Sequence, residues 1–374
     1  MSLWIIILTI AVFLLGISLT YIGIRIPRFF PSEVVANWTK TKEFLISAWI
    51  IILLMGSVSY WLNLINAFVC AFYLAMIWMM TDFVFWIVHK IFHTTFQHYY
   101  AGWTAIIIGV IALTIGWILN HYVVQTNYTL STDKDISSLR IVMFADVHLG
   151  ATFDAEGFQK HLKKMEKQKP DLITLVGDFV DDDTTKEEMI KACKFLGQIK
   201  TKYGIYFVLG NHDKGYYGAA HRGFSLKELL IELKKNDIIV LQDETVPVGD
   251  SFYLIGRKDF SEVVERKRER QSMEKLTAHL DKSKYIIVLD HQPADFKNQA
   301  KSEVDLVLCG HTHGNQLFPF NQVGKWIGAN DLVSGYEKRN KTNFIVSSGI
   351  SDWAIRFKTG TKSEFLVIDI KKNQ

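Results

Sequence analysis

The sequence predicts a chain in two parts, four transmembrane helices followed by an α/β domain. Only eight of its 80 charged side chains lie in the first 125 residues, whereas eight of its ten Trp lie there. The rest has ordinary globular composition, in which short apolar runs alternate with segments of helical spacing. Five of these runs end in clusters of Asp, His or Asn. A wholly soluble protein is therefore excluded, and so is disorder in the second part.

Residues 3–24 carry no charge and are long enough to cross a hydrocarbon core of about 30 Å. No Lys or Arg precedes this segment and no A-x-A site follows it, so we expect a transmembrane helix and not a cleaved signal peptide. Further spans are expected at 44–62, 66–89 and 103–124. Both ends of the 1–124 region then lie on one side of the membrane.

Basic residues near the spans predict the orientation of the chain. Five lie in the first and third loops and two follow the fourth span: Arg25, Arg28, Lys40, Lys42 and Lys90, against Lys134 and Arg140. We therefore expect a multi-pass protein of the cell (inner) membrane with an extracytoplasmic C-terminal domain. The net charge of +4 is spread thinly, so no nucleic-acid partner is expected, and the sequence leaves the oligomeric state open.

Asp82, His89 and His93 have the spacing of one helical face in the third span. Polar side chains at membrane depth are costly and are often functional. One interpretation is that Asp82 pairs with Asn120 or His121 to hold the bundle together. The other is that the three residues handle a substrate or an ion.

Residues 125–138 are polar and aperiodic, which predicts a linker before a domain at 139–374. The domain's predicted strands are apolar runs that end in a polar cluster: 139–144, 171–176, 203–209, 284–289 and 305–309. Helical spacing is found between them, at 154–168, 184–200 and 225–235. Sheets of this class bind ligands at the carboxyl ends of their strands, so we expect a site there.

Each predicted strand is followed by potential metal ligands. The clusters are Asp146-Val147-His148, Gly177-Asp178-Phe179-Val180-Asp181, Gly210-Asn211-His212-Asp213, Asp290-His291-Gln292-Pro293 and Gly310-His311-Thr312-His313-Gly314. Imidazole and carboxylate without thiolate suit Mn²⁺, Fe²⁺ or Zn²⁺. In an extended D-x-H or H-x-H segment, residues two apart point to the same side, so two ligands can face one site. One cluster is a weak signal, but five in this order predict a metal centre.

The five clusters resemble the calcineurin-like metallophosphoesterases, whose motifs are D-x-H, G-D-x-x-D, G-N-H-[DE], H-x-P and G-H-x-H in this order. The resemblance covers about 140–370 and implies a four-layer sandwich, with helices outside two mixed β-sheets. The last motif is similar to G-H-T-H-G-[GN]-Q of a subgroup that includes exported YkuE-type proteins and a lipid A pathway pyrophosphatase. Asn315 stands where the second Gly is usual, which bears on substrate contacts.

The resemblance implies two divalent metal ions, with Mn²⁺ favoured, held by seven side chains. One ion is bound by Asp146, His148 and His313. The other is bound by Asn211, His291 and His311. Asp178 bridges the two.

The same resemblance gives roles to four residues beside the ligands. His212 protonates the leaving oxygen or stabilises the transition state, and Asp213 orients the His212 imidazole. Asp181 and Asp290 are expected to hydrogen-bond to ligands and not to bind metal.

The sequence gives weaker evidence for the residues that contact the substrate. Arg257 and Asp259 follow a further strand at 252–256, and either meet the substrate or lie in a surface turn. Ser347-Ser348-Gly349-Ile350 and Arg356 resemble a late S-R-G-[IV]-G and Arg pattern of the subgroup, which implies a phosphate contact for Arg356. The mixed-charge run 265–270 is expected to be a solvated face.

An apolar stretch follows the last cluster directly: Leu317-Phe318-Pro319-Phe320, then Trp326 and Ile327. It is either buried core or a wall that admits an acyl or prenyl chain. The sequence thus predicts a membrane-bound phosphohydrolase that cleaves a phosphoester or pyrophosphate bond, with a lipid or lipid-linked substrate and membrane lipids as partners. The alternatives are a phosphodiesterase for soluble nucleotide or cell-wall phosphates, and a scaffold without catalysis, which the complete set of ligands disfavours.

Overall fold

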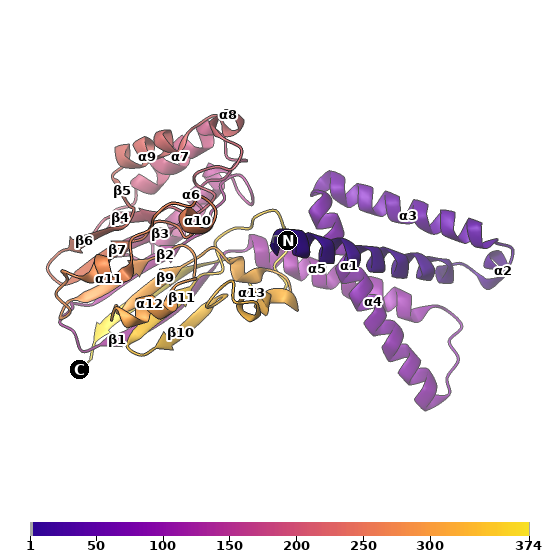
Figure 1. Ribbon diagram of the computed structural model, residues 1–374. Helices are drawn as coiled ribbons and strands as arrows, with labels where there is room; N and C mark the ends of the chain where they lie inside the picture. Colours follow the sequence, from indigo (N-terminus) through magenta and orange to yellow (C-terminus); the bar gives the residue numbers. More distant parts are fainter. Residues whose placement is uncertain (1–2, 374) are drawn as a thin grey trace. The chain divides into compact units, whose positions relative to one another are not determined.

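The computed structural model describes residues 3–373 and shows two compact units, coloured along the chain in Figure 1. The membrane unit comprises Met1–Trp117 and Ala354–Arg356. The α/β unit comprises Ile118–Trp353 and Phe357–Gln374.

The membrane unit is helical. Its elements are α1 (Leu3–Arg25), η1 (Ile26–Phe29), α2 (Ser32–Val35), α3 (Lys40–Trp61), α4 (Leu64–Phe92) and α5 (Tyr100–His121). Within the described residues, four stretches are long and apolar enough to cross a membrane: Thr9–Phe29, Lys40–Trp61, Leu64–Phe92 and Tyr100–His121. The predicted four long apolar helices at the N-terminus are confirmed.

Asp82 is the centre of a polar cluster in the membrane unit. Its carboxylate accepts hydrogen bonds of 2.6, 2.6 and 2.7 Å from Arg25, Tyr21 and Tyr99. A carboxylate at membrane depth needs such partners because lipid offers none. The predicted pairing of Asp82 with Asn120 is wrong, because the Asn120 amide donates to Asp352.

The predicted helical face shared by Asp82, His89 and His93 is also incomplete. α4 ends at Phe92, and His93 has a left-handed backbone with a φ of 51°. His93 therefore leaves the helical path that Asp82 and His89 follow.

The α/β unit contains two six-stranded mixed sheets. The first has the order β1-β12-β2-β3-β4-β5, with strands Val124–Thr132, Glu364–Lys372, Leu139–Phe144, Leu172–Val176, Ile205–Val208 and Ile238–Leu241. The second has the order β10-β11-β9-β8-β7-β6, with strands Gly335–Arg339, Thr342–Val346, Leu306–Cys309, Tyr285–Leu289, Phe252–Gly256 and Glu244–Val248. β2, β3, β4 and β5 run parallel to one another, and so do β7, β8, β9 and β11.

Short helices connect the strands of the α/β unit. They are α6 (Ala155–Glu166), α7 (Lys186–Gly197), α8 (Ala219–Arg222), α9 (Leu226–Lys235), α10 (Ser261–Val264), α11 (Met273–Thr277), α12 (Phe296–Lys301), η2 (His313–Asn315), η3 (Phe320–Gln322) and α13 (Val323–Trp326). In α6, the buried residues Phe158, Leu162 and Met165 follow the helical repeat, and the Asp154 side chain caps the first turn.

Three apolar cores separate four layers. Ile141 and Leu172 of the first sheet pack with Ile287 and Leu306 of the second in the core between the sheets. Side chains of α6, α7 and α9 cover the outer face of the first sheet, and those of α11 and α12 cover the outer face of the second. Figure 1 shows these helices on opposite sides of the paired sheets. The predicted α/β sandwich, with helices outside two mixed sheets, is confirmed.

The predicted linker at 125–138 is largely a strand. β1 (Val124–Thr132) pairs in parallel with β12 along its whole length. Its exposed and less exposed residues alternate, as in an edge strand with one solvated face. The sequence did not predict this strand for two reasons. Its composition is polar, and its partner β12 lies near the other end of the α/β unit's sequence. Two residues separate the end of α5 at His121 from the start of β1 at Val124.

Candidate metal centre

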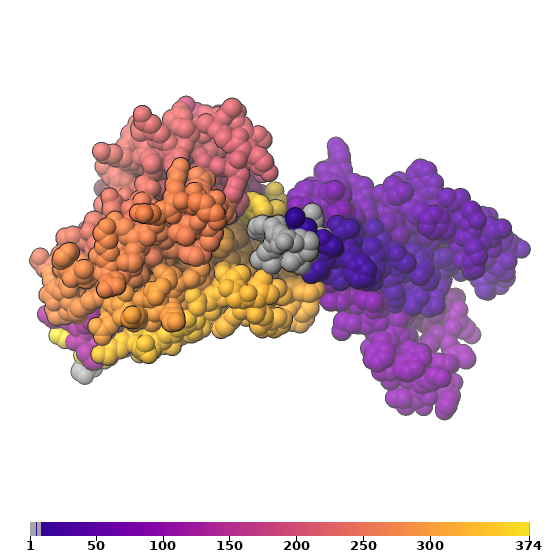
Figure 2. All heavy atoms as spheres, in the orientation of Figure 1, coloured from indigo at the N-terminus to yellow at the C-terminus, as the bar shows by residue number. Residues whose placement is uncertain are grey.

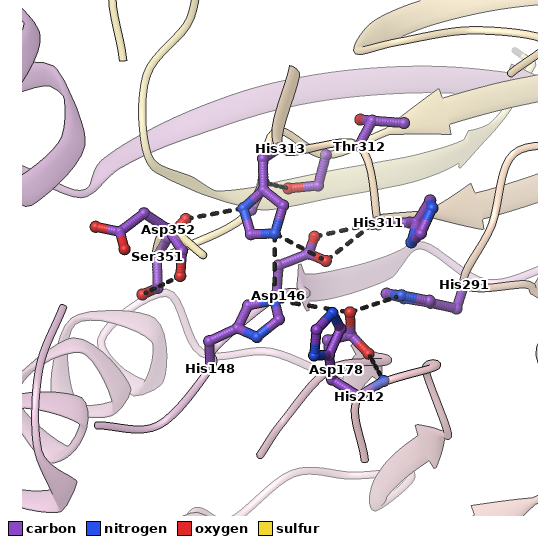
Figure 3. Close-up of polar contacts among 12 residues, drawn as sticks. Asp146, His148, Asp178, His212, His291, His311, Thr312, His313, Ser351 and Asp352 are labelled. Carbon is purple, nitrogen blue, oxygen red and sulfur yellow. Dashed lines mark hydrogen bonds and ion pairs between the residues drawn. The ribbon is translucent and has the colours of Figure 1, made fainter. Parts of the chain in front are cut away.

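The five predicted ligand clusters follow β2, β3, β4, β8 and β9, and the structure brings them together (Figure 3). Five residues other than Gly in these clusters have a positive backbone φ, between 39° and 73°: Asp146, His148, Asp178, His311 and His313. Such conformations cost about 1–3 kcal/mol each in residues other than Gly and cluster at functional sites. The predicted extended D-x-H geometry is therefore wrong, because both ligands of that motif sit on left-handed backbone.

Two motif glycines let the loops approach the ligands closely. A Cβ on Gly177 would lie 2.1 Å from His291 Nδ1, and Gly177 itself has a φ of 83°. A Cβ on Gly210 would lie 2.1 Å from Asp178 Oδ1. Because no side chain fits in either place, these positions require glycine.

The first candidate metal group contains Asp146, His148 and His313, whose ligand atoms lie within 4.8 Å of one another. His148 Nε2 is 3.2 Å from His313 Nε2, and His313 Nε2 is 3.8 Å from Asp146 Oδ1. The other ring nitrogen of each His has a buried acceptor: His148 Nδ1 contacts Asp181 Oδ2 and His313 Nδ1 contacts the Ser351 carbonyl, both at 3.2 Å. These contacts leave both Nε2 atoms for an ion.

The second candidate group contains Asp178, His291 and His311. His291 Nε2 lies 3.1 Å from Asp178 Oδ2, while His291 Nδ1 contacts the Val176 carbonyl at 2.8 Å. Asp178 Oδ2 also lies 3.6 Å from His148 Nε2, so this carboxylate contacts both groups.

Asn211 follows β4 in the same loop as His212. Its Oδ1 atom is buried and accepts no hydrogen bond within the described residues, as expected of an atom that faces a cation.

The electrostatics of the two groups fit divalent cations. Burial raises the pKa of the Asp146 carboxyl to about 6, so this group needs a nearby positive charge to stay ionised. Burial lowers the pKa of His311 to about 4 and that of His313 well below its usual value, so both imidazoles are neutral and have lone pairs for a metal. Burial also lowers the pKa of His291, but Asp178 overcomes this and holds it well above the usual value.

Comparison with known proteins agrees with this geometry. The sequence profile of the calcineurin-like phosphoesterases matches residues 139–315. A metallophosphoesterase of Aquifex aeolicus is 30% identical over 193 residues, which cover 51% of this chain and 70% of that protein. The chain belongs to the calcineurin-like metallophosphoesterase family. The family is one of phosphoester hydrolases that typically bind two divalent metals.

Other relatives are similar to this chain over longer stretches. A Campylobacter jejuni metallophosphoesterase is 30% identical over 253 residues, 66% of this chain and 64% of that protein, so the chain spans just under two thirds of that relative's length. A Danio rerio protein described as a transmembrane protein with metallophosphoesterase domain is 30% identical over 246 residues, 64% of this chain and 54% of that protein. YkuE of Bacillus subtilis, of the predicted subgroup, is 26% identical over 271 residues, 67% of this chain and 86% of that protein.

His212 lies beside the candidate metal ligands (Figure 3). Its backbone N–H donates to Asp178 Oδ1 at 2.9 Å. Its imidazole packs against His148, Tyr216 and Trp353, with ring centroids 4.9, 5.2 and 5.0 Å away. Burial lowers the pKa of His212, so at neutral pH the ring is uncharged and has one N–H to donate.

Asp213 does not orient the His212 imidazole, which corrects the prediction. Its carboxylate accepts four backbone N–H groups at 2.7–3.1 Å, from Asp178, Phe179, Val180 and Gly210. Asp213 is completely buried, and these donors use both of its oxygens. It ties the loop after β3 to the loop after β4, and so holds Asp178 and Asn211 in place.

Asp181 and Asp290 were both expected to hydrogen-bond to metal ligands, but within the described residues only Asp181 does so. Asp181 contacts the ligand His148, as predicted. Asp290 instead accepts hydrogen bonds from Arg257 at 3.1 Å and Gln299 at 2.7 Å, and pairs with Arg270. The prediction of a ligand contact for Asp290 is therefore wrong, because this carboxylate belongs to a buried ion-pair network behind the second sheet's strand ends.

The same network corrects the role of Arg257. Its side chain is 4% exposed, and it also bonds Asp295 at 2.6 Å and the Gln271 carbonyl at 3.2 Å. A substrate cannot reach a guanidinium buried in this way. Asp259 is fully buried too; its Oδ1 accepts from Ser261 and Gln292, while its Oδ2 has no partner within the described residues.

Asn315 and Arg356 each have a hydrogen-bond partner outside the two candidate metal groups. The Asn315 amide donates to the Asn321 carbonyl at 3.1 Å, within the segment after the last motif. Arg356 belongs to the membrane unit, where its backbone N–H donates to Asn66 Oδ1 at 2.8 Å. A substrate contact for either residue stays a prediction.

Tyr216, Ser351 and Trp353 contact site residues but were not predicted from the sequence. Tyr216 lies four positions beyond His212, and its aromatic neighbour Tyr217 made the pair look like ordinary surface composition. Ser351 acts through its carbonyl, which leaves no side-chain signal. For Trp353, the one signal is a large aromatic residue close to the late S-S-G-I motif.

Proposed function

We propose that this protein is a hydrolase with two divalent ions that cleaves a phosphoester or pyrophosphate bond in a lipid or lipid-linked substrate. The observation that carries the proposal is an exposed apolar segment that follows the last ligand motif in sequence, in a chain with four apolar helices. The pyrophosphate option is supported by the motif shared with the lipid A pathway subgroup.

In this proposal Asp146, His148 and His313 hold one ion. Asn211, His291 and His311 hold the other, and Asp178 touches both. Two divalent ions so placed supply a water that is activated near neutral pH and stabilise the charge that develops on the phosphoryl group. Mn²⁺ is favoured among the metals that this set of oxygen and imidazole ligands suits.

His212 acts on the leaving group in this proposal. Its imidazole is fixed beside His148 through the backbone bond to Asp178 and the packing of Tyr216 and Trp353. Its N–H can donate to the leaving oxygen as the phosphorus–oxygen bond breaks.

The apolar segment begins at Leu317, four residues after the candidate ligand His313. Phe318, Phe320, Trp326 and Ile327 are 57, 41, 74 and 53% exposed. Figure 2 shows this part of the chain, in gold, at the surface of the α/β unit. The interpretation of these residues as buried core is therefore wrong. Exposed apolar groups gathered near a site favour an apolar ligand, and an acyl or prenyl chain provides one.

A second candidate is a phosphodiesterase of soluble nucleotide or cell-wall phosphates. A cavity of about 200 Å³ at the ends of β4, β5 and β7 favours it. The lining of this cavity is largely charged and includes Lys214, Lys258, Asp259, Glu262 and Arg266. Such a lining suits a polar molecule better than a lipid chain.

Both candidates place the protein in the cell (inner) membrane with its α/β unit outside the cytoplasm. The excess of basic residues in the first and third loops supports this orientation. Asp133→Cys, in the turn between β1 and β2, should react with a membrane-impermeant maleimide on intact cells. Labelling only after lysis would contradict the orientation.

Turnover of lipid and soluble substrates by full-length protein tests the proposal. The rate on a phosphodiester lipid in Mn²⁺-containing proteoliposomes is compared with the rate on bis-p-nitrophenyl phosphate. We expect Phe318→Ser with Trp326→Ser to lower the ratio of the two kcat/KM values at least fivefold. Ile231→Ser, on exposed α9, is the matched control. An unchanged ratio would favour the soluble-substrate candidate, and no turnover of either compound would oppose both.

A further inference from the structure

Asn211 differs from the other expected ligands because its amide has two unlike ends. The oxygen end can bind a cation, whereas the N–H end repels one. The two ends have nearly the same shape, so a neighbouring group must select which of them faces the ion. In the structure Nδ2 donates to the Tyr216 hydroxyl at 3.0 Å, and the buried Oδ1 has no hydrogen-bond partner within the described residues.

We propose that Tyr216 is a positioning residue for the second metal ion. Its hydroxyl oxygen binds the N–H end of the Asn211 amide and thereby leaves the oxygen end for the ion. The inference rests on the metal assignment made in the proposed function, and it does not depend on the identity of the substrate.

Tyr216 is itself held in place by backbone contacts. Both oxygens of Asp182 accept its N–H, at 2.9 and 3.0 Å, and Asp182 also accepts the Tyr217 N–H at 3.1 Å. The tight turn before Tyr216 passes through Gly215, which has a φ of 71° and an N–H bonded to the His212 carbonyl at 2.8 Å. The tyrosine is therefore held by Asp182 of the loop after β3 and by the Gly215 turn of the loop that supplies Asn211.

The phenol ring has a second contact in the site. It packs at 73° against the His212 imidazole, with the ring centroids 5.2 Å apart. Its hydroxyl accepts from Asn211 Nδ2 at 3.0 Å. The ring contact would survive replacement by Phe, whereas the hydrogen bond would not.

Metal binding to Tyr216→Phe tests the proposal without any substrate. Full-length protein in detergent is stripped with a chelator and titrated with Mn²⁺, and free Mn²⁺ is followed by its electron paramagnetic resonance signal. Loss of a residue that orients a metal ligand typically weakens binding 10- to 100-fold. We therefore expect the second ion to bind at least about tenfold more weakly and the first to be unaffected. Tyr217→Phe, next in sequence and 76% exposed, is the matched control.

A second background separates orientation of the amide from general damage to the loop. In Asn211→Asp, both ends of the side chain are oxygens, so its rotation no longer matters. Adding Tyr216→Phe to Asn211→Asp should then change the affinity for the second ion less than twofold. The proposal is overturned if Tyr216→Phe alone binds both ions as the wild type does, or if the weakening is equally large in the Asn211→Asp background. Failure to find a lipid substrate would leave either result unaltered.

Discussion

The two metal groups are supported in different ways. In the first, the two His ligands are oriented by Asp181 and by the Ser351 carbonyl, and both supporting residues are buried. In the second, Asn211 is oriented by Tyr216, which is 47% exposed. Ligands held by buried groups lose little freedom when an ion binds. The first site is therefore preorganised, while the second depends on a side chain at the surface.

Asp178 contacts both metal groups, so replacing it should affect both of them. Asp178→Asn removes the charge that the two ions share, so we expect turnover of bis-p-nitrophenyl phosphate to fall by more than about 100-fold, beyond the usual range for residues outside the ligand set. Bound Mn²⁺ should fall from two ions to one or none. The exposed Asp250→Asn is the control. Two bound ions with normal turnover in Asp178→Asn would refute the shared role.

Asp213 supports both groups through the backbone. Asp213→Ala leaves four buried N–H groups without an acceptor, so we expect the free energy of unfolding of the α/β unit to fall by about 3–5 kcal/mol. The melting temperature should drop by about 10 °C, measured by scanning fluorimetry of the detergent-solubilised protein. His212→Ala should lose turnover with a much smaller change in melting temperature. Equal shifts in the two variants would contradict the structural role of Asp213.

Replacing Asp181 tests whether the first metal group depends on its buried supporting residue. Asp181→Ala frees the His148 ring, and we expect the first ion to bind about 10- to 100-fold more weakly in the Mn²⁺ titration. Asp183→Ala, two residues on with an exposed side chain, is the matched control. If Asp181→Ala instead weakened only the second ion, the assignment of His148 to the first group would be wrong.

Chelation of the wild-type protein should give the smallest effect. Because the second group relies on a surface residue, we expect one of two bound Mn²⁺ ions to leave on addition of a chelator at least a few times faster than the other. Metal analysis of samples desalted at successive times measures this difference. Loss of both ions at one rate would show that the two groups are equally held.

The sequence was most informative where local patterns and tertiary structure agree. The apolar runs at 139–144 and 284–289 became β2 and β8, because central strands covered on both faces are apolar throughout. The ligand groups were also predicted, since the carboxyl ends of these strands meet at one edge.

Other features depend on contacts that no local pattern records. β1 is polar and is defined by pairing with β12, far away in sequence. Asp213 binds backbone N–H groups of a distant loop, so its residue type suggested a catalytic role that its position does not allow. The partners of Asp82 come from two other segments, around Tyr21 and Tyr99.

The pairing of β1 with β12 also bears on how the protein is made. β1 leaves the ribosome directly after the fourth span, but its partner strand follows only after every other strand of the domain has been synthesised. Until then β1 has unpaired N–H and C=O groups that could join a wrong strand. The polar residues of β1, which are Gln, Thr, Asn and Ser, favour solubility of this unpaired strand. The first sheet therefore closes only after chain synthesis has passed β12.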